Sequence, residues 1–328
     1  LYPSNAIPKL PRCRLFFCSG NHAVFQLTVY PAGKSAEVHG RRSALLNKVF
    51  VYTILVILVI FLFLPILLTI LYSFFSPEEI RYLLGLTSSK SWLPIILSPS
   101  VASLGQYYQV FLGNHGILER IVYSLLYSFA VLLGQVWIAP SLSYALSAYR
   151  FRGKNIIFIS IILFMLLPFQ VTMIPNMLVL RQMRLINTIW AIILPFIFSP
   201  FYIFLLRQYM VGIPKALYEA AQLDGAGDVY CFFHIALPIS KPMIGTVLTL
   251  SFAEVWNIVE QPLAFLMHRE DLYPLSTVFN QLISSPTGYE FAGAALYILP
   301  PLLIYFFFME DIVSSIHVID IKQEETNL

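Results

Sequence analysis

A polar segment in the second half of the chain places a carboxylate where it is available for a charged contact with another molecule. Pro214 is suited to the first position of a helix, because its φ is already helical and its missing N–H is not needed there. Gly225 is suited to end that helix in the left-handed conformation. A second short helix is predicted over 228–234, ending before Pro238. Glu219 is therefore expected on the first of two short helices that meet at a glycine joint.

Polar side chains also interrupt an apolar run farther along the chain. Glu254, Asn257 and Gln261 are spaced by three and four residues, so on a continuous helix they share one face. Glu260 lies to one side of that face. Ionisable groups at membrane depth usually face a cavity or a partner. Two interpretations stay open: the face lines a hydrated path or pocket, or it pairs with a companion subunit.

No residue pattern indicates catalysis, metal binding or nucleotide binding. The six histidines are scattered without metal-ligand spacing. Cys13, Cys18 and Cys231 show no disulfide or metal spacing and are interpreted as plain thiols. Residues 32–35 are similar to the end of a phosphate-binding loop, but Thr28 stands where its first glycine is required. We therefore expect a chain that is not an enzyme and binds no metal or cofactor itself.

The elements that position these residues are predicted to be membrane helices. The chain is 58% hydrophobic and 11% charged, whereas soluble domains carry about 25% charged residues. A membrane-spanning helix needs roughly 20 apolar residues. Charge-free runs of that length predict five helices, and the run that contains Glu254 predicts a sixth. The predicted helices cover about 50–74, 120–146, 156–178, 188–206, 243–267 and 291–311.

The sequence thus predicts an all-α integral membrane protein with a transmembrane domain over 50–313 and a polar loop over 207–241. Residues 314–328 are expected to form a cytoplasmic tail. Residues 1–49 are interpreted either as an N-terminal cytoplasmic segment or as a product of start-site choice. Prolines inside the predicted helices free backbone carbonyls, which neighbouring helices or water must satisfy. These prolines are interpreted either as hinges or as ordinary kinks.

Charge predicts the orientation. Arg150, Arg152 and Lys154 cluster in the turn between the second and third predicted helices. The positive-inside rule places this turn in the cytoplasm, and with it the loop 207–241 and both termini. Segment 268–290 then lies outside, as a shaped loop rather than a further helix. The net charge of +3 gives no indication of a nucleic-acid partner.

The loop 207–241 resembles the EAA loop of ABC importer permeases. The match consists of Glu219-Ala220-Ala221, then Gly225, then Ile235-Ala236-Leu237-Pro238, and Asp224, Ala226 and Pro242 also fit. In that family the loop forms a coupling helix that docks into a cleft of a cytoplasmic ATPase. The resemblance implies ATPase coupling by Glu219, Ala220, Ala221, Asp224, Gly225, Ala226, Ile235, Leu237 and Pro238. The alternative is an amphipathic helix that lies on lipid.

Further segments are similar to carbohydrate permeases of the maltose-transporter type, specifically the second, shorter permease of the pair. They are Tyr144-Ala145-Leu146 with 150–154, Leu185-Ile186-Asn187-Thr188, 203–209, and Trp256-Asn257 with Pro262-Leu263. The likeness covers roughly 104–315 and the first predicted helix. Arg184 replaces the usual glycine before Leu185, Ile258 replaces a common acidic residue, and Gln261 replaces a common aromatic one. These departures bear on which sugar is carried rather than on the fold.

The resemblance implies a type I importer bundle of six transmembrane helices with a cytoplasmic coupling helix, in a bacterial or archaeal cytoplasmic (inner) membrane. The implied partners are a companion permease, a cytoplasmic ATPase dimer that binds ATP and Mg, an extracytoplasmic solute-binding protein and membrane lipid. The implied cargo is a sugar or oligosaccharide. Two other functions stay open: an ABC permease for a non-sugar solute, or an ion-driven secondary transporter.

Overall fold

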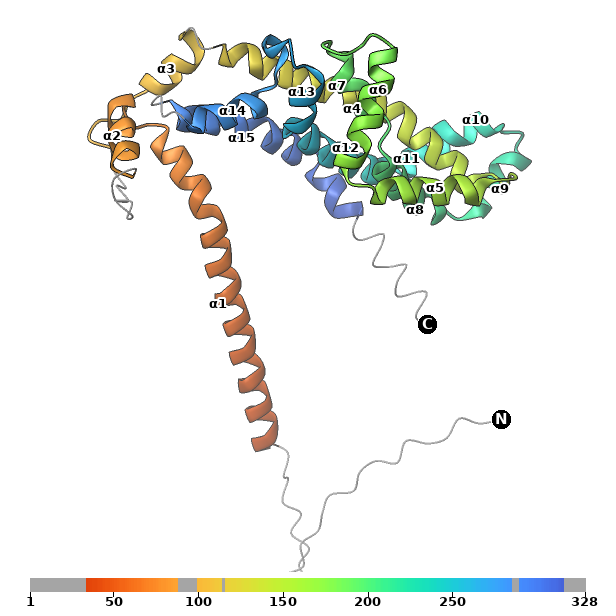
Figure 1. Ribbon diagram of the computed structural model, residues 1–328. Coiled ribbons are helices and arrows are strands. Elements are labelled where there is room, and N and C mark those ends of the chain that lie inside the picture. Colours follow the sequence, from red (N-terminus) through yellow and green to blue (C-terminus); the bar gives the residue numbers. More distant parts are fainter. Residues whose placement is uncertain (1–33, 88–98, 114–115, 285–288, 316–328) are drawn as a thin grey trace, which may run out of the picture. The chain divides into compact units, whose positions relative to one another are not determined.

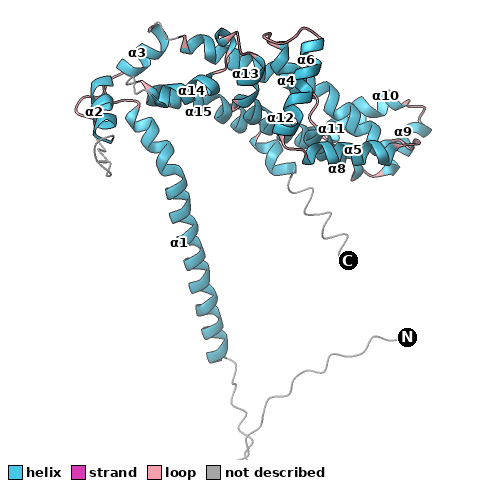
Figure 2. Ribbon diagram, in the orientation of Figure 1, coloured by secondary structure: helices cyan, strands magenta, loops and turns pink. Residues whose placement is uncertain are grey.

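The computed structural model describes residues 34–87, 99–113, 116–284 and 289–315, and within these ranges every regular element is a helix (Figure 2). The chain divides into two units, residues 1–62 and 63–328. The first helices in chain order are α1 Lys34–Tyr72, α2 Pro77–Thr87, α3 Gly105–Leu112, α4 Ile117–Ala148, α5 Lys154–Leu166, α6 Phe169–Gln182, α7 Trp190–Ile197 and α8 Pro200–Val211 (Figure 1). They are followed by α9 Lys215–Leu223, α10 Asp228–Cys231, a π-helix Phe232–Ala236, α11 Leu237–Ile239, α12 Lys241–Trp256, α13 Glu260–Phe265, a 3-10 turn Glu270–Leu272, α14 Leu275–Ser284 and α15 Glu290–Phe307.

Several of these helices are long and apolar enough to cross a membrane. Within the described residues, four candidate spans are Val49–Tyr72 of α1, α4, Trp190–Val211 formed by α7 and α8 with a short break between them, and α15. Two bent pairs also qualify: α5 with α6, bent by 108°, and Asp228–Ile239 with α12, bent by 71°. The described part of the chain therefore has four candidate spans by length and composition, or up to six if each bent pair counts as one.

Helix α1 begins at Lys34, well before the predicted start at residue 50. Its helical backbone extends because no proline interrupts the sequence between Lys34 and Pro65. Side chains from Val49 to Leu64 are exposed and almost entirely apolar. Such a surface suits lipid, in which an intact helix satisfies its own backbone groups.

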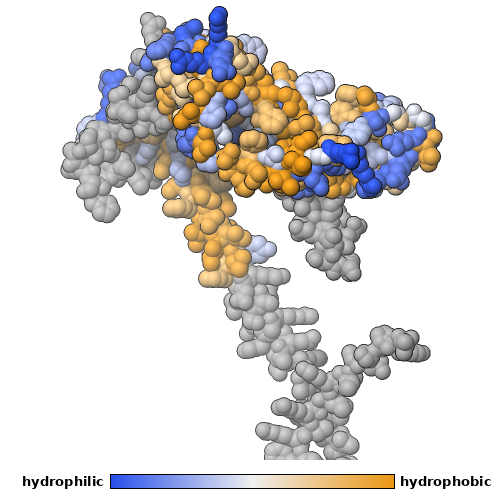
Figure 3. All heavy atoms as spheres, turned by 45° about the vertical axis from the view of Figure 1, so that its right-hand side comes forward, coloured by the Kyte–Doolittle hydropathy of each residue, from blue (hydrophilic) through white to orange (hydrophobic). Residues whose placement is uncertain are grey.

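Helix α4 is the centre of the second unit and packs against α7, α8 and α12. Tyr127 and Val131 lie in a core with Ile192 of α7. Gly134 allows the close approach of α7, because a Cβ at this position would lie 2.7 Å from Ile197. Apolar residues dominate the middle of this unit's visible surface, and hydrophilic residues gather toward its ends (Figure 3).

Two carbonyls that prolines leave without a helical N–H partner receive a side-chain donor from another element. Gln135 Nε2 donates to the carbonyl of Phe196, four residues before Pro200, at 2.7 Å. Trp256 Nε1 donates to the carbonyl of Tyr297, four residues before Pro301, at 3.1 Å. Neighbouring helices thus satisfy the backbone groups that the prolines free.

Two predicted helices are interrupted in the structure. The predicted helix 156–178 is in fact α5 and α6, separated at Leu167 and Pro168, where Pro168 lacks the N–H that would continue the helical hydrogen bonds. The predicted helix 243–267 ends at Trp256 as α12, and the chain turns before α13 begins at Glu260. Pro262 is accommodated within the first turn of α13, where no N–H is needed.

The other predicted boundaries differ less. The predicted helix 188–206 is divided by a short break at Phe198 and Ser199 and continues to Val211. The predicted helix 291–311 corresponds to α15, with helical backbone resuming over 309–315. Most of the N-terminal segment, residues 1–33, and most of the tail, residues 316–328, lie outside the described part of the chain.

Segment 268–290 contains a helix, so its prediction as a loop is wrong. Helix α14 is amphipathic and packs on α4, and its first N–H, of Leu275, donates to Ser124 Oγ at 2.8 Å. The 3-10 turn before α14 carries an ion pair between Arg269 and Asp271 at 2.8 Å. A hydrogen bond from Arg269 lowers the pKa of the Asp271 carboxyl.

Candidate functional site

Helix α9 ends in a hydrogen-bond pattern that requires left-handed backbone. Pro214 directly precedes the helix, and Gly225 follows it with φ of +86°. The N–H of Gly225 donates to the carbonyl of Gln222, and the N–H of Ala226 donates to that of Ala221. This pair of bonds is a Schellman motif, which satisfies carbonyls at the end of a helix. The predicted glycine joint is therefore confirmed.

One face of α9 points away from the rest of the second unit. Ala216, Glu219, Ala220 and Leu223 are exposed, and their spacing places them on one side of the helix. Leu223 is 89% exposed. The Glu219 carboxylate makes no hydrogen bond or ion pair with the part of the chain that the structure describes. This face offers one unpaired carboxylate beside small and apolar side chains.

The opposite face of α9 is fixed to the bundle. Tyr218 and Ala221 pack on a core formed by Tyr144, Met210 and Cys231, and the rings of Tyr218 and Tyr144 are 6.0 Å apart. Burial raises the pKa of the Tyr218 hydroxyl, and neighbouring Cys231 adds to the rise. Tyr218 therefore stays neutral at physiological pH. A movement of α9 is expected to be transmitted to α4 through these rings.

The second helix of the segment does not end before Pro238, as the sequence suggested. Helical backbone runs from Asp228 to Ile239 through a π-helical turn. The N–H of Leu237 donates to the carbonyl of Phe232, five residues back. Pro238 is thus accommodated next to a widened turn, and such turns are frequent at functional sites.

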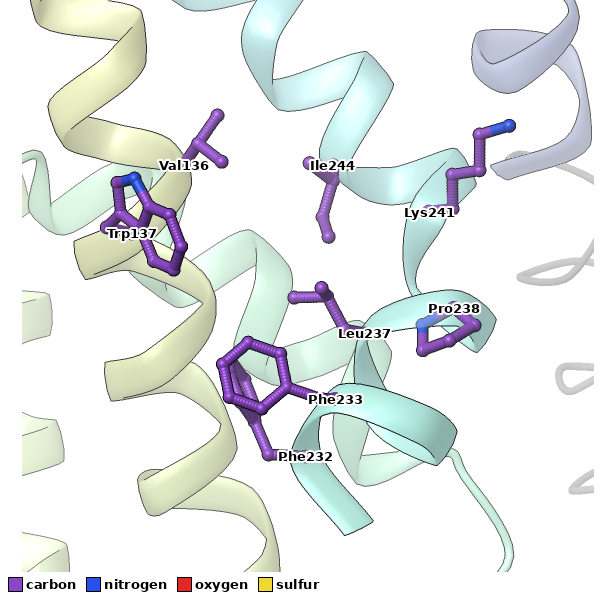
Figure 4. A pocket seen from close by; sticks show the side chains of 8 residues that line it. All are labelled: Val136, Trp137, Phe232, Phe233, Leu237, Pro238, Lys241 and Ile244. Atoms are coloured by element: carbon purple, nitrogen blue, oxygen red, sulfur yellow. The ribbon is translucent and has the colours of Figure 1, made fainter. Parts of the chain in front are cut away.

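A small apolar pocket of about 340 Å³ lies between α4, this π-helix and α12. Trp137, Phe232 and Leu237 point into the space between the helices, whereas the ammonium group of Lys241 points away from it (Figure 4). Pro238 lies at the edge of the pocket. The pocket has little polar surface and provides room for the second helix to shift against α4.

The structure divides the predicted contact residues into three groups. Glu219, Ala220, Asp224 and Gly225 are exposed. Ala221, Ala226 and Ile235 pack on the inner core, so they hold the segment in place. Leu237 and Pro238 line the apolar pocket.

Sequence reasoning missed Leu223 on the exposed face. Its distance of four residues from Glu219 was the available signal, because residues four apart neighbour each other on a helix.

The predicted shared face of Glu254, Asn257 and Gln261 is not a helical face. The first residue belongs to α12, the second follows the end of that helix, and the third belongs to α13. The break nevertheless brings Glu254 and Gln261 to one cavity of about 580 Å³. Asn257 instead accepts a hydrogen bond from the hydroxyl of Tyr297 at 2.8 Å.

Two further contacts define these polar groups. The hydroxyl of Tyr202 donates to the Glu254 carboxylate at 2.6 Å, and Glu260 accepts a hydrogen bond from Gln170 at 3.2 Å. Within the described ranges, no group of three histidine, cysteine or acidic side chains could hold a metal ion.

Residues 139–310 match the family described as the inner membrane component of binding-protein-dependent transport systems. The arabinooligosaccharide transport system permease protein AraQ of Bacillus subtilis is 30% identical, over 70% of this chain and 83% of the relative. A permease protein for uptake of osmoprotective compounds from Synechocystis is 31% identical, over 62% of this chain and 70% of the relative. The structure is also similar to a chain of a bacterial ABC transporter that imports the acidic polysaccharide alginate, with a TM-score of 0.63. That match has 21% identity and covers 86% of this chain and 99% of the other.

Proposed function

We propose that this chain is the permease subunit of an ATP-driven oligosaccharide importer, since it belongs to the family of inner membrane components of binding-protein-dependent transport systems. It works beside a companion permease. An extracytoplasmic binding protein delivers the cargo, and a separate cytoplasmic ATPase dimer binds ATP and Mg. The chain itself carries out no covalent chemistry.

The exposed face of α9 is the observation that carries the coupling role. A carboxylate without an intramolecular partner among the described residues stands beside Ala220, which is small, and Leu223, which is apolar. Small side chains allow a partner's backbone to approach, and an unpaired carboxylate favours a basic group on that partner. A helix that merely lay on lipid would not need the fixed spacing from Glu219 to Gly225 and Pro238.

The coupling movement follows from the two faces of α9. ATP binding brings the two ATPase subunits together and shifts the docked helix. Tyr218 transmits the shift to Tyr144 of α4, which packs on α7, α8 and α12. Since α4 is the centre of the bundle, its displacement changes access to the path between the two permeases.

Oligosaccharide is the cargo that the relatives favour. The AraQ protein is named for arabinooligosaccharide transport, and it is similar over most of its length. The orientation that serves import places α9, the turn at 150–154 and both termini in the cytoplasm, in agreement with the positive-inside rule.

The test is the reversal of charge at Glu219. Glu219→Lys is expected to remove a charge-assisted contact of about 1.5–3 kcal/mol and to repel a basic partner group. Uptake and recovery of the ATPase in a pull-down should fall at least tenfold, whereas the amount of membrane-inserted protein should stay near normal. Glu78→Lys is the matched control, because Glu78 is an exposed glutamate of α2.

If Glu219→Lys keeps uptake and ATPase recovery at wild-type levels, α9 is not the coupling element. Loss of both in the Glu78→Lys control as well would show that the charge reversal acts through general damage to the membrane protein.

A further inference from the structure

The cavity that contains Glu254 and Gln261 lies where three helical spans are broken. Leu167 marks the break between α5 and α6, and Phe198 and Ser199 mark the break between α7 and α8; all three residues line the cavity. Gln261 lies just after the break between α12 and α13. Non-helical backbone at membrane depth is tolerated where it is buried in protein or lines a hydrated cavity. The breaks therefore indicate that this cavity is hydrated or binds a ligand.

The cavity has the size of a ligand site. Its volume is about 580 Å³, within the roughly 300–1,000 Å³ typical of small-molecule pockets. Sites of this kind combine mostly apolar walls with a few polar groups that fix the ligand's orientation. The cavity has that composition, since aromatic rings and polar side chains both line it.

Gln261 contributes a buried side-chain amide to the wall of the cavity. Its side chain is 6% exposed, and its Oε1 has no hydrogen-bond partner. Buried polar atoms are almost always bonded, so an unbonded one at a cavity wall points to a ligand or to water held there. Asn176 and Thr172 of α6 line the same cavity.

Glu254 provides a carboxylate held in place. Buried Tyr202 donates to its Oε2 at 2.6 Å, which leaves Oε1 for another donor. Carboxylate and amide oxygens accept hydrogen bonds from hydroxyl groups. Several such acceptors in one cavity suit a ligand rich in hydroxyls.

Aromatic rings supply the apolar part of the walls. The rings belong to Phe164, Phe169, Phe196, Phe198 and Phe201. The face of an aromatic ring is electron-rich, so it attracts the C–H groups on the face of a sugar ring. An acyl chain would fill the apolar part but would offer no donor to Gln261 Oε1 or to Glu254 Oε1.

The charge of the cavity excludes anionic ligands. Glu254 is acidic, and none of the described residues that line the cavity is basic. A uronate or a sugar phosphate would therefore place a second negative charge beside the Glu254 carboxylate. A single carboxylate is also too few ligands for a metal cation.

We propose that this cavity is a binding site of this chain for neutral oligosaccharides, in which Gln261 and Glu254 accept hydrogen bonds from sugar hydroxyls. The inference rests on the proposed import function and adds to it a preference for uncharged cargo. The site does not depend on α9 or on contact with the ATPase.

The experiment measures binding to the purified permease pair with its ATPase, in detergent and without the binding protein. Saturation-transfer NMR compares arabinotriose as the neutral probe with trigalacturonate as the acidic one. The wild-type complex is expected to bind arabinotriose in preference. Gln261→Leu should weaken arabinotriose binding about tenfold, the factor for one lost hydrogen bond to a buried group. Glu254→Gln should reduce the ratio of the affinity for arabinotriose to the affinity for trigalacturonate.

Glu260→Gln is the matched control, because this residue is exposed, bonds Gln170 and is not among the residues that line the cavity. The proposal is overturned if both site variants bind arabinotriose as tightly as the wild type, or if the control loses as much affinity as they do. It is also overturned if the wild type binds trigalacturonate as tightly as arabinotriose. Wild-type uptake and stimulated ATP hydrolysis, measured in parallel, separate the two inferences. If uptake and stimulated ATP hydrolysis persist although the cavity binds no arabinotriose, the import function stands without this site. If no oligosaccharide stimulates uptake or ATP hydrolysis, the import function is wrong as well.

Discussion

Two residues with left-handed backbone end helices by the same hydrogen-bond pattern. Gly225 ends α9, and Arg184, with φ of +57°, ends α6. The N–H of Arg184 donates to the carbonyl of Arg181, and the N–H of Leu185 donates to that of Leu180. The position is therefore one that favours glycine, yet it holds a large side chain. The departure from the usual glycine, visible in the sequence, has a backbone cost in the structure.

We expect Arg184→Gly to stabilise the protein. The left-handed conformation costs an L-residue about 1–2 kcal/mol, and the added flexibility of glycine in the unfolded chain offsets about half of that. A net gain of about 0.5–1 kcal/mol should raise the thermal unfolding midpoint of the purified protein. Arg181→Gly is the control, because Arg181 lies inside α6, where glycine costs about 1 kcal/mol. An equal decrease in both variants would contradict the argument.

At the scale of elements, the joint between α9 and α10 depends on one glycine and not on its neighbour. Gly225 has φ of +86°, whereas Gly227 has φ of −78°, and a Cβ at either position would meet nothing within 4 Å. Strain from a side chain therefore comes from backbone conformation alone.

Gly225→Ser is expected to strain the joint by about 1–2 kcal/mol and to turn the exposed face of α9 away from its partner. Uptake and ATPase recovery should fall several-fold at an unchanged level of membrane-inserted protein. Gly227→Ser should leave both near wild type, since serine is favoured at the residue that precedes a helix. If the two serine variants behave alike, the geometry of the joint does not matter for coupling.

The sequence predicted the membrane class and the glycine joint, because apolar run length and backbone requirements are local properties. It did not predict where helices break within apolar runs. Pro168 interrupts a helix, whereas Pro140 lies inside intact α4. The difference depends on what surrounds each proline, and that is a tertiary property.

The residues at the cavity likewise could not be placed from the sequence alone. Helical spacing suggested that Glu254, Asn257 and Gln261 share a face, but the break after Trp256 separates them. Glu254 and Gln261 meet because the chain folds back around the cavity. Their polarity within an apolar run was the sound part of the prediction, and their relative placement required the structure.

The second unit has an apolar middle and more polar ends on its visible surface (Figure 3), which suits a bundle that crosses the membrane several times. Segment 215–239 and the basic turn at 150–154 meet through the core beneath α9, where Tyr149 packs near Tyr218. The 3-10 turn at 270–272 belongs to a different core, with α7 and α13. The proposed orientation therefore requires these two regions to face opposite sides of the membrane.

Single cysteines test this arrangement in a background without the native cysteines Cys13, Cys18 and Cys231. His268→Cys and Gln222→Cys are suitable, because both side chains are exposed. An impermeant maleimide should label position 268 in intact cells. It should label position 222 only after the membrane is permeabilised, in cells that lack the ATPase and so leave α9 uncovered. Labelling of position 222 from outside would place α9 on the wrong side for a cytoplasmic ATPase, and the coupling role and the direction of transport would both be lost.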